Sequence, residues 1–107
     1  MKAYFITALT SERVNRAMEK EHGYRFYAHK KCFGFASSKA EALRWIRKYG
    51  SNFVECLFDL LVVELYESGL ERIPAEIAWF RWSDKKRQWL LIAKPRDQRG
   101  TVCYAMP

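Results

Sequence analysis

Two hydrophobic periods run along this chain, and each predicts a different kind of element. Residues 2–9 alternate between side chains that favour strands, and Leu60–Tyr66 is an apolar run interrupted only by Glu64. Such a run predicts a central strand that is covered on both faces. Residues 76–83 and 88–94 predict a hairpin in which three indole rings pair across the strands: Trp79, Trp82 and Trp89.

A helical period separates the first strands from the central one. Apolar residues recur three and four positions apart and predict a buried stripe made of Ala42, Leu43, Ile46 and Tyr49. Ser38 and Glu41 match a capping box, so this helix is expected to begin at Lys39 and to end at Gly50.

The N-terminal half contains a second, weaker helical pattern. Thr10 or Ser11 can cap a short helix that ends at Gly23, with a thin stripe of Val14, Ala17 and Met18. Residues 24–29 and 32–36 then predict strands, with a turn at residues 30–31. Residues 68–74 predict a loop, and residues 101–106 predict a closing strand or a docked tail.

These elements predict one α+β domain over residues 1–107. The expected architecture is a small, largely antiparallel sheet of four to six strands with one or two helices packed on one face. The face away from the helix must then be wet, covered by the hairpin, or used to bind a partner.

Composition narrows the class of protein. The chain has 107 residues, half of them apolar, and no run approaches the roughly 18 apolar residues of a membrane span. The N-terminus lacks a secretory pattern, and the three cysteines form no CxxC or zinc spacing. We therefore expect a cytoplasmic protein without membrane association, metal or cofactor.

Charge is distributed unevenly along the chain. The formal net charge is +7, with eleven basic and four acidic side chains up to residue 52 and seven basic and two acidic from residue 80. Residues 53–79 hold one basic and six acidic side chains. This pattern predicts either a nucleic-acid-binding face or an acidic segment that lies between the basic ones and offsets them.

The hairpin carries the strongest candidate for a binding site. Its basic side chains lie close in sequence to aromatic ones: Arg81, Lys85, Lys86 and Arg87 beside Phe80, Trp82 and Trp89. This mixture suits phosphate contacts combined with base stacking. It also suits a solvated turn whose tryptophans fill the core, or a protein interface rich in Trp and Arg.

Catalytic groups are sparse. Cys32 lies three residues from His29, and Glu55 lies one helical turn from Asp59, but a core cysteine near a surface histidine and a solvated pair of carboxylates explain these spacings. Glu64 is the one charge in the central strand, so it is expected at an edge, beside a buried arginine, or in a site. We therefore predict no catalytic residues.

Residues 31–38 read KCFGFASS and resemble the octamer of the RNA-recognition motif, while residues 4–9 resemble its companion hexamer. This resemblance implies that Phe5, Phe33 and Phe35 stack on unpaired bases and that Lys31 meets a phosphate. Packing favours the opposite orientation, with both Phe33 and Phe35 under the helix, because the intervening side chains bury little area.

A longer stretch, residues 33–69 with the hairpin, resembles uncharacterised small bacterial and phage proteins that place a strand-to-helix unit before a "VIE"-like strand, here residues 62–64. The resemblance implies a compact α+β domain of prokaryotic or viral origin. We therefore expect a non-enzymatic binding or regulatory protein, monomeric or homodimeric, whose partner is a protein or a nucleic acid. The alternatives are a single-stranded nucleic-acid-binding domain that uses the hairpin and Lys31, and an enzyme.

Overall fold

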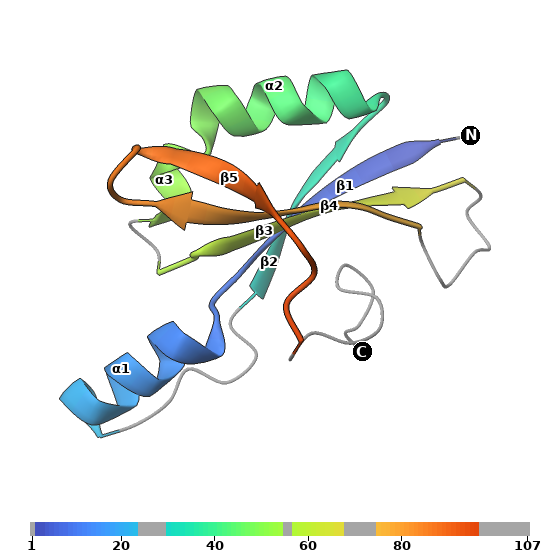
Figure 1. Ribbon diagram of the computed structural model, residues 1–107. Helices are drawn as coiled ribbons and strands as arrows, with labels where there is room; N and C mark the ends of the chain where they lie inside the picture. The colour runs from blue at the N-terminus through green and yellow to red at the C-terminus, as the bar shows by residue number, and fades with distance from the viewer. Residues whose placement is uncertain (1, 24–29, 55–56, 68–74, 97–107) are drawn as a thin grey trace.

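One antiparallel sheet organises the protein. The computed structural model describes residues 2–23, 30–54, 57–67 and 75–96. Its elements are, in chain order, β1 (Ala3–Leu9), α1 (Glu12–His22), β2 (Lys30–Ala36), α2 (Lys39–Tyr49), α3 (Ser51–Val54), β3 (Leu60–Tyr66), β4 (Ala75–Ser83) and β5 (Gln88–Ile92). The five strands lie in the order β2-β1-β3-β4-β5, and every neighbouring pair is antiparallel (Figure 1). The predicted α+β class is confirmed.

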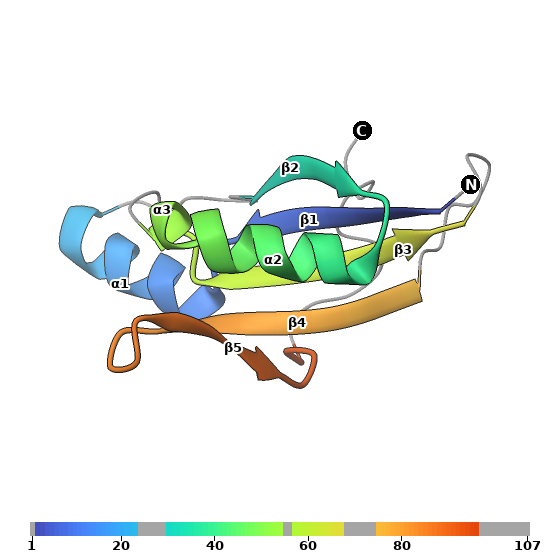
Figure 2. The same ribbon diagram turned by 90° about the horizontal axis from the view of Figure 1, so that it is seen from above.

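The helices take different positions relative to the sheet. Figure 1 shows α2 lying over one face, whereas α1 extends beyond the end of β1. The view from above places the C-terminal end of α2 and the β4–β5 turn at the same end of the sheet (Figure 2). This arrangement matters because it brings a helix end next to the hairpin that carries the predicted site.

The face of α2 that meets the sheet differs from the predicted stripe at one position. Ala42 and Ile46 are buried in a core with Ile6, Leu61 and Val63. Tyr49 was expected in this stripe, but 42% of it is exposed. The half-buried ring of Trp45 packs against the core instead, because the sheet lies under residues 42, 45 and 46 rather than under the last turn.

Capping fixes both ends of α2 near their predicted positions. The Ser38 hydroxyl accepts the Glu41 N–H at 3.1 Å, as expected for an N-cap. In a capping box the Glu41 carboxylate would bond to the N-cap residue, Ser38. Here it accepts a hydrogen bond from the hydroxyl of the preceding residue, Ser37, at 2.8 Å. Gly50 follows the helix, and its N–H donates to the Ile46 carbonyl at 2.8 Å.

A partly buried carboxylate attaches α1 to the sheet. Ser11 caps this helix, and its N–H and hydroxyl donate to the Asp59 carboxylate at 2.7 and 2.5 Å. Gly23 ends the helix with a φ of 80°. The predicted stripe of α1 is not a core face, since Asn15 is the residue of this helix that is buried. Asp59 therefore has a structural role.

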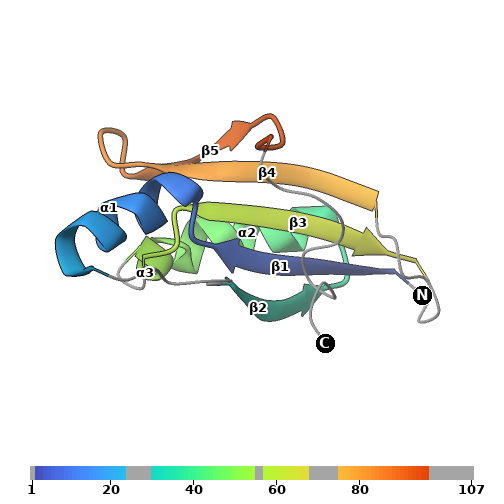
Figure 3. The same ribbon diagram turned by 90° about the horizontal axis from the view of Figure 1, so that it is seen from below.

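The central strand is buried on both faces, as its sequence predicts. Toward α2 it contributes Leu61 and Val63, and on the opposite face Leu60 and Val62 pack with Trp79. Glu64 lies on that opposite face and is fully buried at 0% exposure. Figure 3 shows β3 between β1 and β4, so the expectation of an edge position for Glu64 is wrong.

A β-bulge in β2 separates the two phenylalanines. Residues 30–31 belong to β2 rather than to a turn, and the register with β1 shifts between Ile6 and Thr7, which pair with Gly34 and Cys32. Phe33, the extra residue, packs on the core toward Trp45 and Phe58, with centroid distances of 6.1 Å. Phe35 is 69% exposed, so its predicted core position is wrong.

Three of the predicted segments, residues 24–29, 68–74 and 101–106, lie outside the described residues. The β4–β5 hairpin and the C-terminal end of α2, which together form the candidate site, both lie within the described residues.

Candidate binding cleft between α2 and the hairpin

A four-residue turn connects β4 and β5. The Lys86 N–H donates to the Ser83 hydroxyl at 3.2 Å, which closes the turn from one side. Arg87 ends the turn with a φ of 54°, a left-handed conformation that is unfavourable for a residue with a Cβ. The Arg87 guanidinium lies over the ring of Trp82, next to the last residue of β4.

An arginine and two tryptophans form one cluster at the base of this turn. Trp82 pairs with Trp89 across the strands, and their rings meet at a centroid distance of 5.5 Å and an angle of 65°. The indole N–H of Trp82 donates to the Asp84 carboxylate at 2.9 Å. The Arg87 guanidinium lies 5.5 Å from the centroid of the Trp82 ring, within the range of a cation–π contact.

The end of α2 touches this cluster through a glycine. A Cβ built on Gly50 would lie 2.6 Å from the indole nitrogen of Trp89, closer than any side chain tolerates. Gly50 has an ordinary helical φ of −63°, so close approach rather than backbone conformation requires glycine here. The Trp89 ring therefore rests directly on the helix terminus.

A cleft opens between the helix and the hairpin. Its volume is about 300 Å³, at the lower end of the range for small-molecule sites. The lining residues come from both elements: Leu43, Ile46, Arg47 and Ser51 on the helical side, and Phe80, Trp82, Arg87, Gln88 and Trp89 on the hairpin. Two arginines thus face a wall of aromatic rings.

The described lining of the cleft includes two basic side chains and no acidic one. Among the described residues, no carboxylate lies within salt-bridge distance of Arg47 or Arg87. Further exposed cations extend from the cleft along α2 and the turn: Arg44, Lys48, Lys85 and Lys86. A guanidinium held without a carboxylate partner is suited to bind a phosphate or a carboxylate of a ligand.

The structure brings together only part of the predicted site. Trp82 and Arg87 line the cleft, and Lys85 and Lys86 lie exposed on the adjoining turn. Arg81 points to the opposite face of the sheet, because it alternates with Trp82 along β4.

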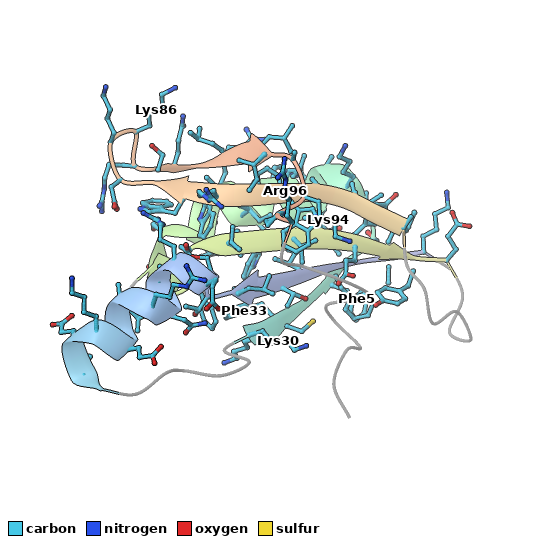
Figure 4. The ribbon with its side chains drawn as sticks, turned by 60° about the horizontal axis from the view of Figure 1, so that its bottom comes forward. Phe5, Lys30, Phe33, Lys86, Lys94 and Arg96 are labelled. Atoms are coloured by element: carbon cyan, nitrogen blue, oxygen red, sulfur yellow. The ribbon has the colours of Figure 1, made fainter. Side chains whose placement is uncertain are left out.

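Lys31 is not part of this cluster, because it lies on β2 at the far edge of the sheet. There its ammonium is 5.3 Å from the ring of Phe33. In Figure 4, Lys86 at the β4–β5 turn and Lys30 on β2 lie at opposite edges of the sheet.

Arg47 is the cleft residue that sequence reasoning missed. The helical period places it correctly on the exposed side of α2, but periodicity carries no information about which loop that side adjoins. The signal that could have identified it is Gly50, since a glycine one turn after Arg47 allows the hairpin to approach the helix end.

The other chemical candidates do not form a catalytic site within the described residues. No group of three potential metal ligands occurs there, and Cys32 is exposed, so its expected core position is wrong. Glu64 lines neither the cleft nor the smaller cavity of about 90 Å³ between β2 and α2. In the described part of the chain, no helix is long and apolar enough to span a bilayer.

Comparison with models of protein families, with curated proteins and with solved structures found no match.

Proposed function

We propose that this protein binds single-stranded nucleic acid through the cleft between α2 and the β4–β5 hairpin. The observation that carries this proposal is a pair of arginines, Arg47 and Arg87, that line the same cleft as a tryptophan pair and have no carboxylate partners in the described residues. Phosphates supply the negative charge for the guanidinium groups, and bases supply flat rings for the indoles.

The shape of the cleft favours a single strand over a duplex. Its aromatic wall lies inside a concavity of about 300 Å³, which a flat surface of stacked base pairs does not enter. An unpaired base can enter it, because its ring faces are free to contact aromatic side chains. The exposed cations along α2 and the turn then contact the phosphates on either side of that base.

The chemistry of the lining favours binding over catalysis. Among the described side chains that form the cleft there is no carboxylate, thiol or imidazole. General acid–base chemistry uses such groups, whereas guanidinium and indole groups recognise charge and flat rings. The net charge of +7 acts in the same direction, because it accelerates encounters with a polyanion.

The test is a fluorescence-anisotropy titration of labelled single-stranded oligonucleotides at several salt concentrations. Arg87→Gly is the sharpest variant, because glycine accepts the left-handed conformation and the fold is expected to be at least as stable. Arg47→Gln removes the second guanidinium, and Lys31→Gln removes a cation at the far edge as the matched control. Melting curves of all three proteins verify the fold.

Wild-type affinity should fall as salt rises, and each arginine variant should bind several-fold more weakly with a salt slope reduced by about 0.7. Lys31→Gln should bind like the wild type. The proposal fails if no binding is found at low salt, if the arginine variants bind unchanged, or if the control is weakened equally.

A further inference from the structure

The two edges of the sheet are built differently. At one edge, β2 begins with Lys30 and Lys31, contains the bulge at Phe33, and bends at Gly34, whose φ is 128°. Charges and bulges of this kind are the devices by which proteins prevent an edge strand from pairing with another chain. The β2 edge is therefore protected.

At the other edge, β5 has none of these devices. Its five residues, QWLLI, include no charge and no proline, and they pair with β4 in continuous register. The side chain of Leu91 is 71% exposed. An apolar, regular and accessible edge strand is a template for a further strand.

The direction of the outer backbone groups follows from one hydrogen bond. The Trp82 N–H donates to the Asp59 carbonyl at 3.1 Å, on the β3 side of β4. Trp82 and Trp89 are therefore a non-hydrogen-bonded pair of the β4–β5 ladder, and Leu91 occupies the same phase as Trp89. The N–H and C=O groups of Trp89 and Leu91 consequently point outward, away from β4.

We propose that a second copy of this chain docks on this edge, strand β5 against strand β5, around a two-fold axis at Leu90. In an antiparallel pairing centred there, Trp89 of one copy lies opposite Leu91 of the other, and both present outward backbone groups. The strand is thus complementary to itself in its hydrogen-bonding phase. The two sheets become one continuous sheet with a protected β2 edge at each end.

This docking also changes the cleft. Trp89 and Leu91 share the face of the sheet on which α2 lies, because they pair with Trp82 and Phe80 of the cleft wall. Leu91 of the second copy therefore adjoins Trp89 and adds an aliphatic side chain to the wall of the cleft. Each cleft of the dimer contains a residue from both copies.

Charge gives the dimer a distinctive salt dependence. Each chain has a net charge of +7, so two copies repel each other across the interface. Screening weakens this repulsion, so association should strengthen as salt rises. Nucleic-acid binding should weaken over the same range of salt concentration. Because the two salt dependences are opposite, a failure of the dimer proposal can be distinguished from a failure of the nucleic-acid proposal.

The experiment is sedimentation equilibrium of the full chain at 50 and 500 mM salt, with two substitutions of exposed hydrophobic residues on opposite edges. Leu91→Lys places a charge on the β5 edge, and Phe35→Lys places the same charge on the β2 edge, where the wild-type side chain is 69% exposed. The wild type and Phe35→Lys should form dimers, more completely at high salt, and Leu91→Lys should be monomeric.

A crosslink tests the register directly. Leu90 would face its own copy across the axis in a non-hydrogen-bonded pair, with a Cα separation of about 4.5 Å that suits a disulfide. Leu90→Cys should give a covalent dimer on oxidation, and the parent chain should not. Three outcomes would overturn the proposal: a wild type that is monomeric at both salt concentrations, a dimer that Leu91→Lys leaves intact, or a Leu90→Cys chain that does not crosslink. The first outcome would favour an extended peptide as the partner of this edge.

Discussion

Truncating Phe33 and Phe35 separately gives the most direct test of how β2 is built. The two rings are two residues apart in sequence, so a regular strand would place them on the same face. The bulge instead places Phe33 on the core toward Trp45 and Phe58, while Phe35 projects from the other face beside Phe5. The same substitution at the two positions should therefore have unequal effects.

The expected magnitudes follow from burial and ring contacts. Truncating a fully buried phenylalanine costs about 3–5 kcal/mol. Because Phe33 is half-buried and has ring contacts to Trp45 and Phe58, Phe33→Ala should lower the free energy of unfolding by about 2–3 kcal/mol. Phe35 is 69% exposed with a ring contact to Phe5 at 5.5 Å, so Phe35→Ala should cost about 0.5–1 kcal/mol.

Urea denaturation followed by far-UV circular dichroism measures both values on one scale. The midpoint should shift clearly for Phe33→Ala and only slightly for Phe35→Ala, with the same slope for both, because neither change alters the surface exposed on unfolding by much. Equal losses at the two positions would mean that the rings share one environment. A larger loss for Phe35→Ala would refute the bulge as the structure places it.

The fold was largely predictable because its strongest signals are local. The apolar run Leu60–Tyr66 is typical of a central strand, and the Ser38 cap with Gly50 set the limits of α2. Gly23 did the same for the end of α1, and its cap was predicted at Thr10 or Ser11, of which the structure has Ser11. Caps and turns depend on a few neighbouring residues, so their positions can be read without knowledge of the tertiary structure.

The orientation of Phe35 could not be predicted in the same way. A bulge adds one residue to a strand and reverses the alternation after it, and the alternation was the signal from which both rings were assigned to the core. Gly34 marks the position, since its φ of 128° is rarely open to other residues. An isolated glycine in a strand pattern indicates such a bulge, but it does not say which neighbour changes face.

The site was half predictable. Trp82 and Arg87 belong to one short hairpin, so their proximity follows from strand pairing alone. Arg47 is 40 positions away from Arg87 in the sequence, and it joins them because the end of α2 packs on Trp89. That contact depends on the placement of a whole helix over the sheet, which no local pattern specifies.

Two further substitutions test the contacts that hold the helices in place. Gly50→Ala should lower the free energy of unfolding by about 1–3 kcal/mol and alter tryptophan emission, because the new Cβ would lie 2.6 Å from the Trp89 indole nitrogen. Unchanged stability and emission would contradict this close approach. Asp59→Ala should cost about 1.5–3 kcal/mol, because the Ser11 N–H and hydroxyl lose a charged acceptor in a partly buried position. Amide hydrogen exchange should then accelerate more in α1 than in α2, because the cap of α2 does not involve Asp59. Equal acceleration in both helices would show that Asp59 stabilises the whole fold rather than the attachment of α1.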